Sequence, residues 1–120
     1  MATSRIKVAP NRAERMAKMI ILLVRDDSLS HEEFAERLRE EHVPIAEDLP
    51  GLVEYRTSLP RDPSRAAYDG VSELYFEDGA AMGEAFKSEA GKEVQADAAE
   101  FMDVEANETL VVDEETHVEP

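Results

Sequence analysis

The sequence contains no cysteine, and this absence narrows the chemistry open to the protein. Without thiols there are no disulfides, no thiolate nucleophile and no cysteine-based zinc or iron–sulfur site. Glycine-rich phosphate loops, serine nucleophile motifs and nucleotide-cofactor fingerprints are also missing. The three histidines, His31, His42 and His117, share no metal-ligand spacing. We therefore expect the protein to work without a metal and without a cofactor.

Long apolar segments are missing as well. The longest apolar run, residues 19–24, is far shorter than the roughly 20 residues that a membrane-spanning helix needs, and no signal-peptide core precedes it. A chain of 120 residues suits one domain with a modest hydrophobic core. The sequence therefore predicts a soluble, cytoplasmic protein.

Basic residues are scarce, with 13 Lys and Arg against 28 Asp and Glu and a formal net charge of −15. Such a chain repels nucleic acid and anionic membranes, because few basic side chains can contact phosphates. Residues 1–15 carry net positive charge and lack apolar periodicity, so we interpret them as a loose extension before a domain at residues 16–118. The acidic excess favours adaptation to high salt, and an ordinary acidic protein is the alternative.

The clearest structural signal in the chain is a helix start at Ser30. Ser30 followed by Glu33 is a capping box, in which each side chain satisfies a backbone N–H of the first turn. Leu29 and Phe34 stand at the positions of a hydrophobic staple. The helical period then continues the apolar face through Leu38.

His42 lies at the edge of that apolar face, close to a helix breaker. Pro44 has no N–H to donate and pushes Val43 away from helical angles, so we expect the helix to kink or break beside His42. A carbonyl left free by Pro44 would then share one site with the imidazole. Pro50 and Gly51 end the helical segment.

The other elements alternate between strands and helices. Four strands are predicted, and the first is apolar on both of its faces: residues 16–25, 52–59, 71–77 and 108–113. A second helix opens at Asp78 and is interrupted near Ser88, which can cap a second helical piece. The acidic end after residue 113 is expected to fray. With right-handed crossovers, the order βαββαβ predicts a ferredoxin-like α+β fold.

In that fold the first and third strands are central in a four-stranded antiparallel sheet, and both helices cover one face. The other face is bare, although the first strand is apolar on that side too. Two such sheets packed face to face would bury it, so we expect a homodimer. The alternative is a monomer whose termini cover the bare face.

Four short motifs follow one another along the chain. They are LSHEEF from Leu29, the step from His42 to Pro44, LPGL at residues 49–52, and YDGV from Tyr68 followed by Glu73, Leu74 and Phe76. In this order they resemble the EthD family of dimeric α+β barrel proteins, over about residues 16–115. The resemblance implies a homodimer with a small-molecule cavity in each subunit. It also implies activities such as ether and aromatic degradation, cofactor-independent oxidation of anthrones, or muconolactone methyl isomerisation.

Methylisomerase members of that family use a histidine and a tyrosine, to which His42 and Tyr55 correspond here. Their cysteines have no counterpart in this chain. The two side chains also suit acid–base chemistry, because His42 can exchange a proton near neutral pH and Tyr55 can donate a hydrogen bond to a developing oxyanion. The alternative is structural: His42 bonds the free carbonyl, and Tyr55 is a core residue.

The predicted substrate-binding residues are Phe34, Leu38, Glu73 and Tyr75, with a position at the barrel rim as the alternative for Glu73. The function we expect is a cofactor-independent oxidoreductase or isomerase acting on a small carbonyl, phenolic or xenobiotic-degradation compound. The alternative is a non-catalytic dimeric module that binds a ligand or assists a neighbouring degradative enzyme. The structure can distinguish these two functions, because an enzyme requires His42 and Tyr55 to converge on a cavity, whereas in a non-catalytic module both can be packed in the core.

Overall fold

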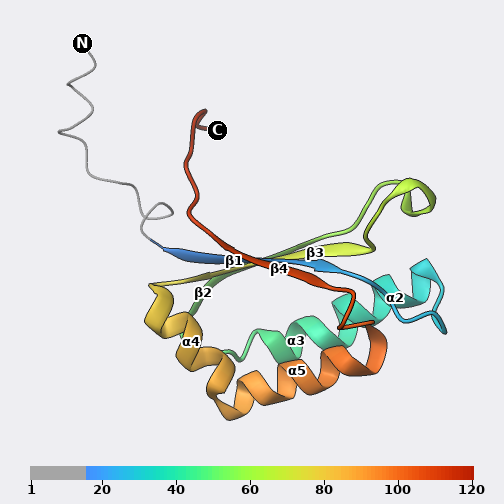
Figure 1. Cartoon of the computed structure of the whole chain (residues 1–120), viewed down its shortest axis with the longest axis horizontal. Helices are drawn as coiled ribbons and strands as arrows, with labels where there is room; N and C mark the ends of the chain where they lie inside the picture. Colours follow the sequence, from blue (N-terminus) through green and yellow to red (C-terminus); the bar gives the residue numbers. More distant parts are fainter. Residues whose placement is uncertain (1–15) are drawn as a thin grey trace.

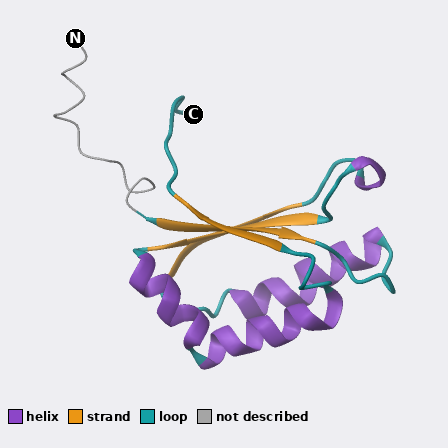
Figure 2. Ribbon diagram, in the orientation of Figure 1, coloured by secondary structure: helices purple, strands orange, loops and turns teal. Residues whose placement is uncertain are grey.

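The computed structural model describes residues 16–120, so the extension predicted at residues 1–15 lies outside the described residues. Four antiparallel strands form one sheet in the order β2-β3-β1-β4: β1 Ala17–Leu23, β2 Leu52–Ser58, β3 Gly70–Phe76 and β4 Glu108–Val112. The α-helices all lie against one face of this sheet (Figures 1 and 2). The ferredoxin-like arrangement with the first and third strands central is therefore confirmed.

Two helical segments cover the sheet. The first contains α2 His31–Arg37, the π-helical turn η2 Leu38–His42 and α3 Val43–Ala46. The second contains α4 Gly79–Lys87 and α5 Glu89–Phe101. A short 3₁₀ turn, η3 Pro63–Arg65, lies in the loop after β2. The capping box is present, since the Glu33 N–H donates to the Ser30 hydroxyl at 3.0 Å and the Ser30 N–H donates to the Glu33 carboxylate at 2.8 Å. Ser88 caps α5, as predicted. In this described part, none of the helices is long and apolar enough to span a membrane.

The helix does not break at Pro44, so that part of the prediction is wrong, although the regular α-helix is interrupted beside His42. The preceding π-helical turn, η2, is closed by a hydrogen bond from the Val43 N–H to the Leu38 carbonyl. A π turn is wider than an α turn, and it places Pro44 in the first turn of α3, where a missing N–H costs little. Val43 accordingly keeps helical angles, with φ −57° and ψ −46°.

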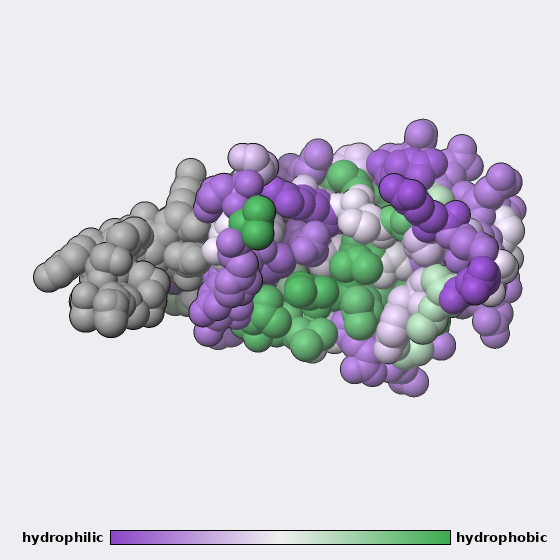
Figure 3. Space-filling model, turned by 90° about the horizontal axis from the view of Figure 1, so that it is seen from above, coloured by the Kyte–Doolittle hydropathy of each residue, from purple (hydrophilic) through white to green (hydrophobic). Residues whose placement is uncertain are grey.

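The side chains of β1 separate the two faces of the sheet. Met19 and Ile21 pack against the helices as part of the core. Alternation then places Lys18, Ile20 and Leu22 on the face without helices, which we call the open face. Figure 3 looks onto this face and shows apolar side chains gathered across it.

Glu114, in the acidic segment that the sequence predicted to fray, is held against the open face, whereas residues 115–120 are exposed and extend away from the sheet (Figure 1). Glu114 accepts a hydrogen bond from Lys18 Nζ at 2.8 Å and another from the Tyr75 hydroxyl at 3.1 Å. Lys18 Nζ also lies 2.9 Å from Glu73. A largely buried ammonium group requires such partners, and the chain end supplies one of them. We call Lys18, Glu73, Tyr75 and Glu114 the open-face network.

Candidate active site

His42 and Tyr55 border the same internal cavity, between the helices and the covered face of the sheet. This inner cavity has a volume of about 100 Å³. Its polar lining consists of His42, Tyr55, Ser72, Gln95 and Asn107, and its other lining residues are apolar. His42 ends η2, whereas Tyr55 lies on β2 opposite the core residue Leu74 and so faces the helices.

The imidazole of His42 is held by a carboxylate. The carbonyl freed at Pro44, which was the structural alternative from the sequence, is not its partner. His42 Nδ1 lies 2.8 Å from Oδ2 of Asp97 on α5. Arg37 donates two further hydrogen bonds to this carboxylate, at 2.8 and 3.1 Å, and its guanidinium lies 4.7 Å from the ring centre of Phe101. The side chains of His42, Asp97 and Arg37 are 7%, 12% and 18% exposed. We call these three residues the His42 network.

The His42 network determines which imidazole nitrogen can act as a base. Arg37 holds the pKa of Asp97 below its usual range, against the opposing effect of burial, so Asp97 is ionised at neutral pH. An ionised carboxylate only accepts hydrogen bonds, so Nδ1 carries the proton of a neutral His42 ring. Nε2 then has the lone pair and is the nitrogen left to exchange a proton with a bound molecule.

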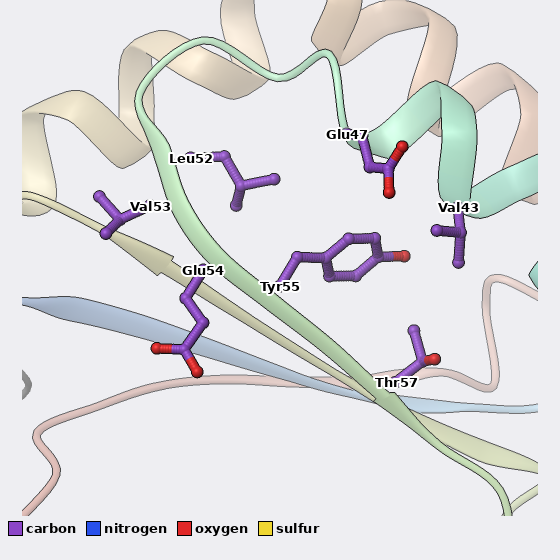
Figure 4. A pocket seen from close by; sticks show the side chains of 7 residues that line it. All are labelled: Val43, Glu47, Leu52, Val53, Glu54, Tyr55 and Thr57. Atoms are coloured by element: carbon purple, nitrogen blue, oxygen red, sulfur yellow. The ribbon is translucent and has the colours of Figure 1, made fainter.

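Tyr55 supplies a hydrogen-bond donor on the other side of the cavity. Burial raises its pKa to about 12, with a smaller contribution from Glu47, and a hydrogen bond with Ser72 opposes the shift. The phenol therefore stays protonated at neutral pH. Figure 4 shows its ring extending from β2 toward α3, with the hydroxyl directed to the side of Val43. Tyr55 also lines an open groove between β2 and α3, so it borders both the inner cavity and this outer groove.

The remaining polar side chains of the inner cavity are fixed by the backbone. The Gln95 amide donates to the carbonyls of Phe86 and Gly91 at 3.2 and 3.1 Å, and Asn107 accepts from the Val24 N–H at 2.7 Å. Within residues 16–120, no three His, Cys, Asp or Glu side chains are grouped to hold a metal ion. The cavity therefore suits a small, largely apolar molecule with a hydrogen-bonding group.

Phe34 and Leu38, predicted to bind substrate, lie in the core and not on this cavity. They are 1% and 0% exposed and belong to a cluster with Phe101. Both follow the helical period that brings His42 inward, but Phe34 lies two turns and Leu38 one turn closer to the helix start. They support the helix that carries His42.

Glu73 and Tyr75 do not border the cavity either, because they lie on the open face. Successive β3 side chains alternate, and the neighbouring Leu74 is in the core. The two side chains contact Lys18 instead, through the ion pair with Glu73 and through the Tyr75 ring, 5.0 Å from Nζ. The structure thus brings together His42 and Tyr55 and separates them from the other predicted residues.

The sequence analysis missed Asp97 and Arg37. Asp97 follows Val94 by three residues and precedes Phe101 by four, and both of those residues are buried. Arg37 similarly follows the buried Phe34 by three residues. Both residues could have been found from the sequence, because each is a charged residue on the buried face of a helix. A charge in such a place requires a partner.

A sequence model of the EthD domain matches residues 26–105. The chain belongs to the EthD family. The resemblance carried by the four motifs is thereby confirmed. Among curated proteins, no sequence matches this EthD chain.

Solved structures share the fold of this EthD protein. An EthD family protein from Bacillus halodurans C-125 has 22% identity and a TM-score of 0.72, covering 83% of this chain and 99% of that one. SnoaB from Streptomyces nogalater, described as a cofactor-independent oxygenase, has 12% identity and a TM-score of 0.66, covering 87% and 97%. A protein of unknown function from Bacteroides fragilis, described as dimeric with a ferredoxin-like fold, has 13% identity and a TM-score of 0.64, covering 82% and 95%. At these identities the likeness establishes the fold.

Proposed function

We propose that this EthD protein is a cofactor-independent oxidoreductase or isomerase acting on a small carbonyl or phenolic compound. The observation that supports this most is that His42 and Tyr55 border one cavity. Had both side chains been packed shut in the core, the structure would have favoured the non-catalytic ligand-binding or accessory module. The description of SnoaB, which shares the fold, as a cofactor-independent oxygenase is consistent with this class of chemistry.

The proposed chemistry begins with a proton transfer. His42 Nε2 removes a proton from the carbon beside a carbonyl, or from a phenolic hydroxyl, and Asp97 stabilises the imidazolium that forms. The Tyr55 hydroxyl donates a hydrogen bond to the oxyanion that develops on the substrate. Return of the proton to a different carbon isomerises the compound. Oxidation follows instead if the anion passes electrons to an acceptor such as dioxygen.

The test is a pair of substitutions assayed on a panel of small lactones, phenols and anthrones. His42→Gln keeps an amide that can donate to Asp97 and so preserves the fold, but it removes the proton-exchanging group. We expect the rate to fall roughly 10²- to 10⁴-fold. Tyr55→Phe removes the oxyanion donor at little cost in packing and lowers the rate further.

Circular dichroism and thermal melts accompany both variants. Turnover that neither substitution reduces would contradict the proposal and return the pair to a structural role. Unfolding of His42→Gln would contradict it as well, because it would show that His42 is needed for stability and not for proton transfer alone.

The open face supports a homodimer as the working form. Its apolar residues come from three neighbouring strands, with Ile20 beside Leu110 and Leu22 beside Val71. Leu110 is 47% exposed although it is a large apolar side chain. A second copy packed against this face would remove the exposed patch seen in Figure 3 from water. The Bacteroides fragilis relative with the same fold is described as dimeric.

A further inference from the structure

The outer groove and the inner cavity have one lining residue in common, Tyr55. The groove lies between β2 and α3 and has a volume of about 300 Å³. Its lining includes Val43, which directly follows the cavity residue His42, together with Leu52 and Thr57 (Figure 4). The groove therefore adjoins the cavity at the Tyr55 ring and at the chain step from His42 to Val43.

Size shows why the groove matters for binding. Sites for small organic molecules typically measure roughly 300–1,000 Å³, and an apolar cavity of roughly 150 Å³ holds one benzene ring. The inner cavity, at about 100 Å³, takes at most a compact reacting group. The rest of a larger substrate has to lie outside the cavity, and the outer groove, which adjoins it at Tyr55, is large enough to hold it.

The charge of the groove narrows the kind of molecule that fits. Glu47 is exposed at the groove, and Figure 4 shows its carboxylate on the same side as the Tyr55 hydroxyl. Glu54 points away from that hydroxyl and pairs with Arg56. Within residues 16–120, Glu47 has no recorded ion-pair partner, and neither Lys nor Arg is among the lining residues of the groove or the cavity.

We propose that the outer groove is the second half of the substrate site and that Glu47 makes it select neutral or cationic compounds over carboxylates and phosphates. This inference rests on the proposed function, since the reacting end of the molecule is the one that His42 and Tyr55 contact. The Glu47 carboxylate repels an anionic substituent in the groove, attracts a cationic one and leaves a neutral one nearly unaffected. For an exposed charge this corresponds to about a three- to tenfold difference in affinity.

Three phenols with the same head and a different terminal group test the selectivity. They are tyramine, tyrosol and para-hydroxyphenylacetate, whose end groups are cationic, neutral and anionic. Dissociation constants come from proton–nitrogen NMR titrations at low salt, which also locate the probe through shifts of residues 43–47 and 52–57. The wild type should bind tyramine and tyrosol more tightly than para-hydroxyphenylacetate.

Matched variants separate Glu47 from the overall negative charge. Glu47→Gln should reduce the preference for tyramine over para-hydroxyphenylacetate about three- to tenfold, and Glu47→Lys should reverse it. Glu36→Gln makes the same charge change on an exposed α2 position outside the groove and should leave the preference unchanged. At about 1 M KCl the screening length is roughly 3 Å, so the difference between wild type and Glu47→Gln should shrink.

The proposal is overturned if none of the three probes binds, if Glu47→Gln leaves the preference intact, or if Glu36→Gln changes it equally. Because binding is measured without turnover, the experiment can contradict the proposal for the groove without contradicting the catalytic proposal, and the reverse. Selectivity that follows Glu47 in a protein that turns over no compound supports the groove and contradicts the catalytic proposal. Turnover that depends on His42 with selectivity indifferent to Glu47 gives the opposite result.

Discussion

The two faces of the sheet each hold a network of buried charges, and the two networks are built alike. On the covered face, Arg37 binds Asp97 and stacks on an aromatic ring at 4.7 Å. On the open face, Lys18 binds two carboxylates and lies 5.0 Å from the centre of the Tyr75 ring. In both cases a largely buried cation is satisfied by a carboxylate and an aromatic ring.

The two networks differ in whether they include a side chain that can exchange a proton at neutral pH. The covered face adds a histidine with one ring nitrogen engaged, beside a cavity lined by a tyrosine. On the open face, burial alone would lower the pKa of Lys18, but hydrogen bonds with Glu114 and Glu73 outweigh it and raise the pKa. Lys18 therefore stays charged and cannot serve as a base. A buried charge network marks a candidate active site only where it includes a titratable side chain that borders a cavity.

Removing the carboxylate of the His42 network should have the largest effect. In Asp97→Asn the amide can donate to Nδ1, which favours the tautomer with its proton on Nε2 and removes the base. We expect turnover to fall roughly 10²- to 10⁴-fold. Long-range proton–nitrogen NMR spectra of the imidazole should show the proton move from Nδ1 to Nε2, a readout that needs no substrate.

Glu114→Gln is the matched control on the open face, and it should leave both turnover and the His42 tautomer unchanged. An unaltered tautomer in Asp97→Asn would mean that Asp97 only supports the fold. Equal losses of turnover in the two variants would remove the distinction between the two faces.

Much of the fold could be predicted because its signals are local. The capping residues Ser30 and Ser88 act within a single helical turn, and both helix starts were found from them. Strand alternation and turn residues likewise act over a few positions. The strand order then followed from the handedness of two crossovers.

One part that failed depends on a contact between distant segments. His42 and Asp97 are 55 residues apart, and nothing near His42 indicates which residue will approach its ring. The π turn beside Pro44 was missed for a different reason: its hydrogen bond from Val43 to Leu38 is local, but the rules for proline predict a kink or a break and do not indicate a π turn. The position of Tyr75 was within reach, since apolar Leu74 and Phe76 on either side of it direct it to the open face.

Disrupting the apolar patch of the open face should have the second largest effect. Leu110→Asp places a carboxylate in the apolar patch, so we expect the dimer dissociation constant to rise roughly 10²-fold, the effect of losing one central contact residue. Sedimentation equilibrium measures it. Val111→Asp is the control, because Val111 follows on the same strand, faces the other side opposite Met19 and is 63% exposed. Equal weakening by both variants would point to the edge of β4 and not to the open face.

A smaller effect is expected from removing the cation of the open-face network. Lys18→Met leaves Glu73 and Glu114 facing one another, both of them partly exposed. Their partial hydration limits the loss to about 1–3 kcal/mol in the free energy of unfolding, less than for a fully buried pair. Urea denaturation measures it, and the double variant Lys18→Met/Glu73→Gln should recover part of the loss. Unchanged stability in Lys18→Met would show that the chain end is not held by this network.

The smallest effect we predict is the pH dependence of each network, and it compares the two faces directly. Arg37 lowers the pKa of Asp97, and Lys18 lowers the pKa of Glu114. A carboxylate with a lowered pKa in the folded protein contributes stability that is complete above its unfolded pKa of about 4. That contribution is lost as the pH falls through the lower, folded value. Wild type should therefore exceed Asp97→Asn in stability at neutral pH, and the excess should shrink below pH of about 4 as Asp97 becomes protonated.

Urea denaturation from neutral to acidic pH, at about 1 M KCl to screen the remaining charges, follows this difference. Glu114→Gln should show the same trend with a smaller amplitude, because the side chain of Glu114 is 28% exposed and that of Asp97 is 12% exposed. A difference between wild type and Asp97→Asn that persists unchanged in acid would mean that Asp97 is not ionised in the folded protein. Nδ1 of His42 would then be free to accept the proton, and the assignment of Nε2 as the base would fail with it.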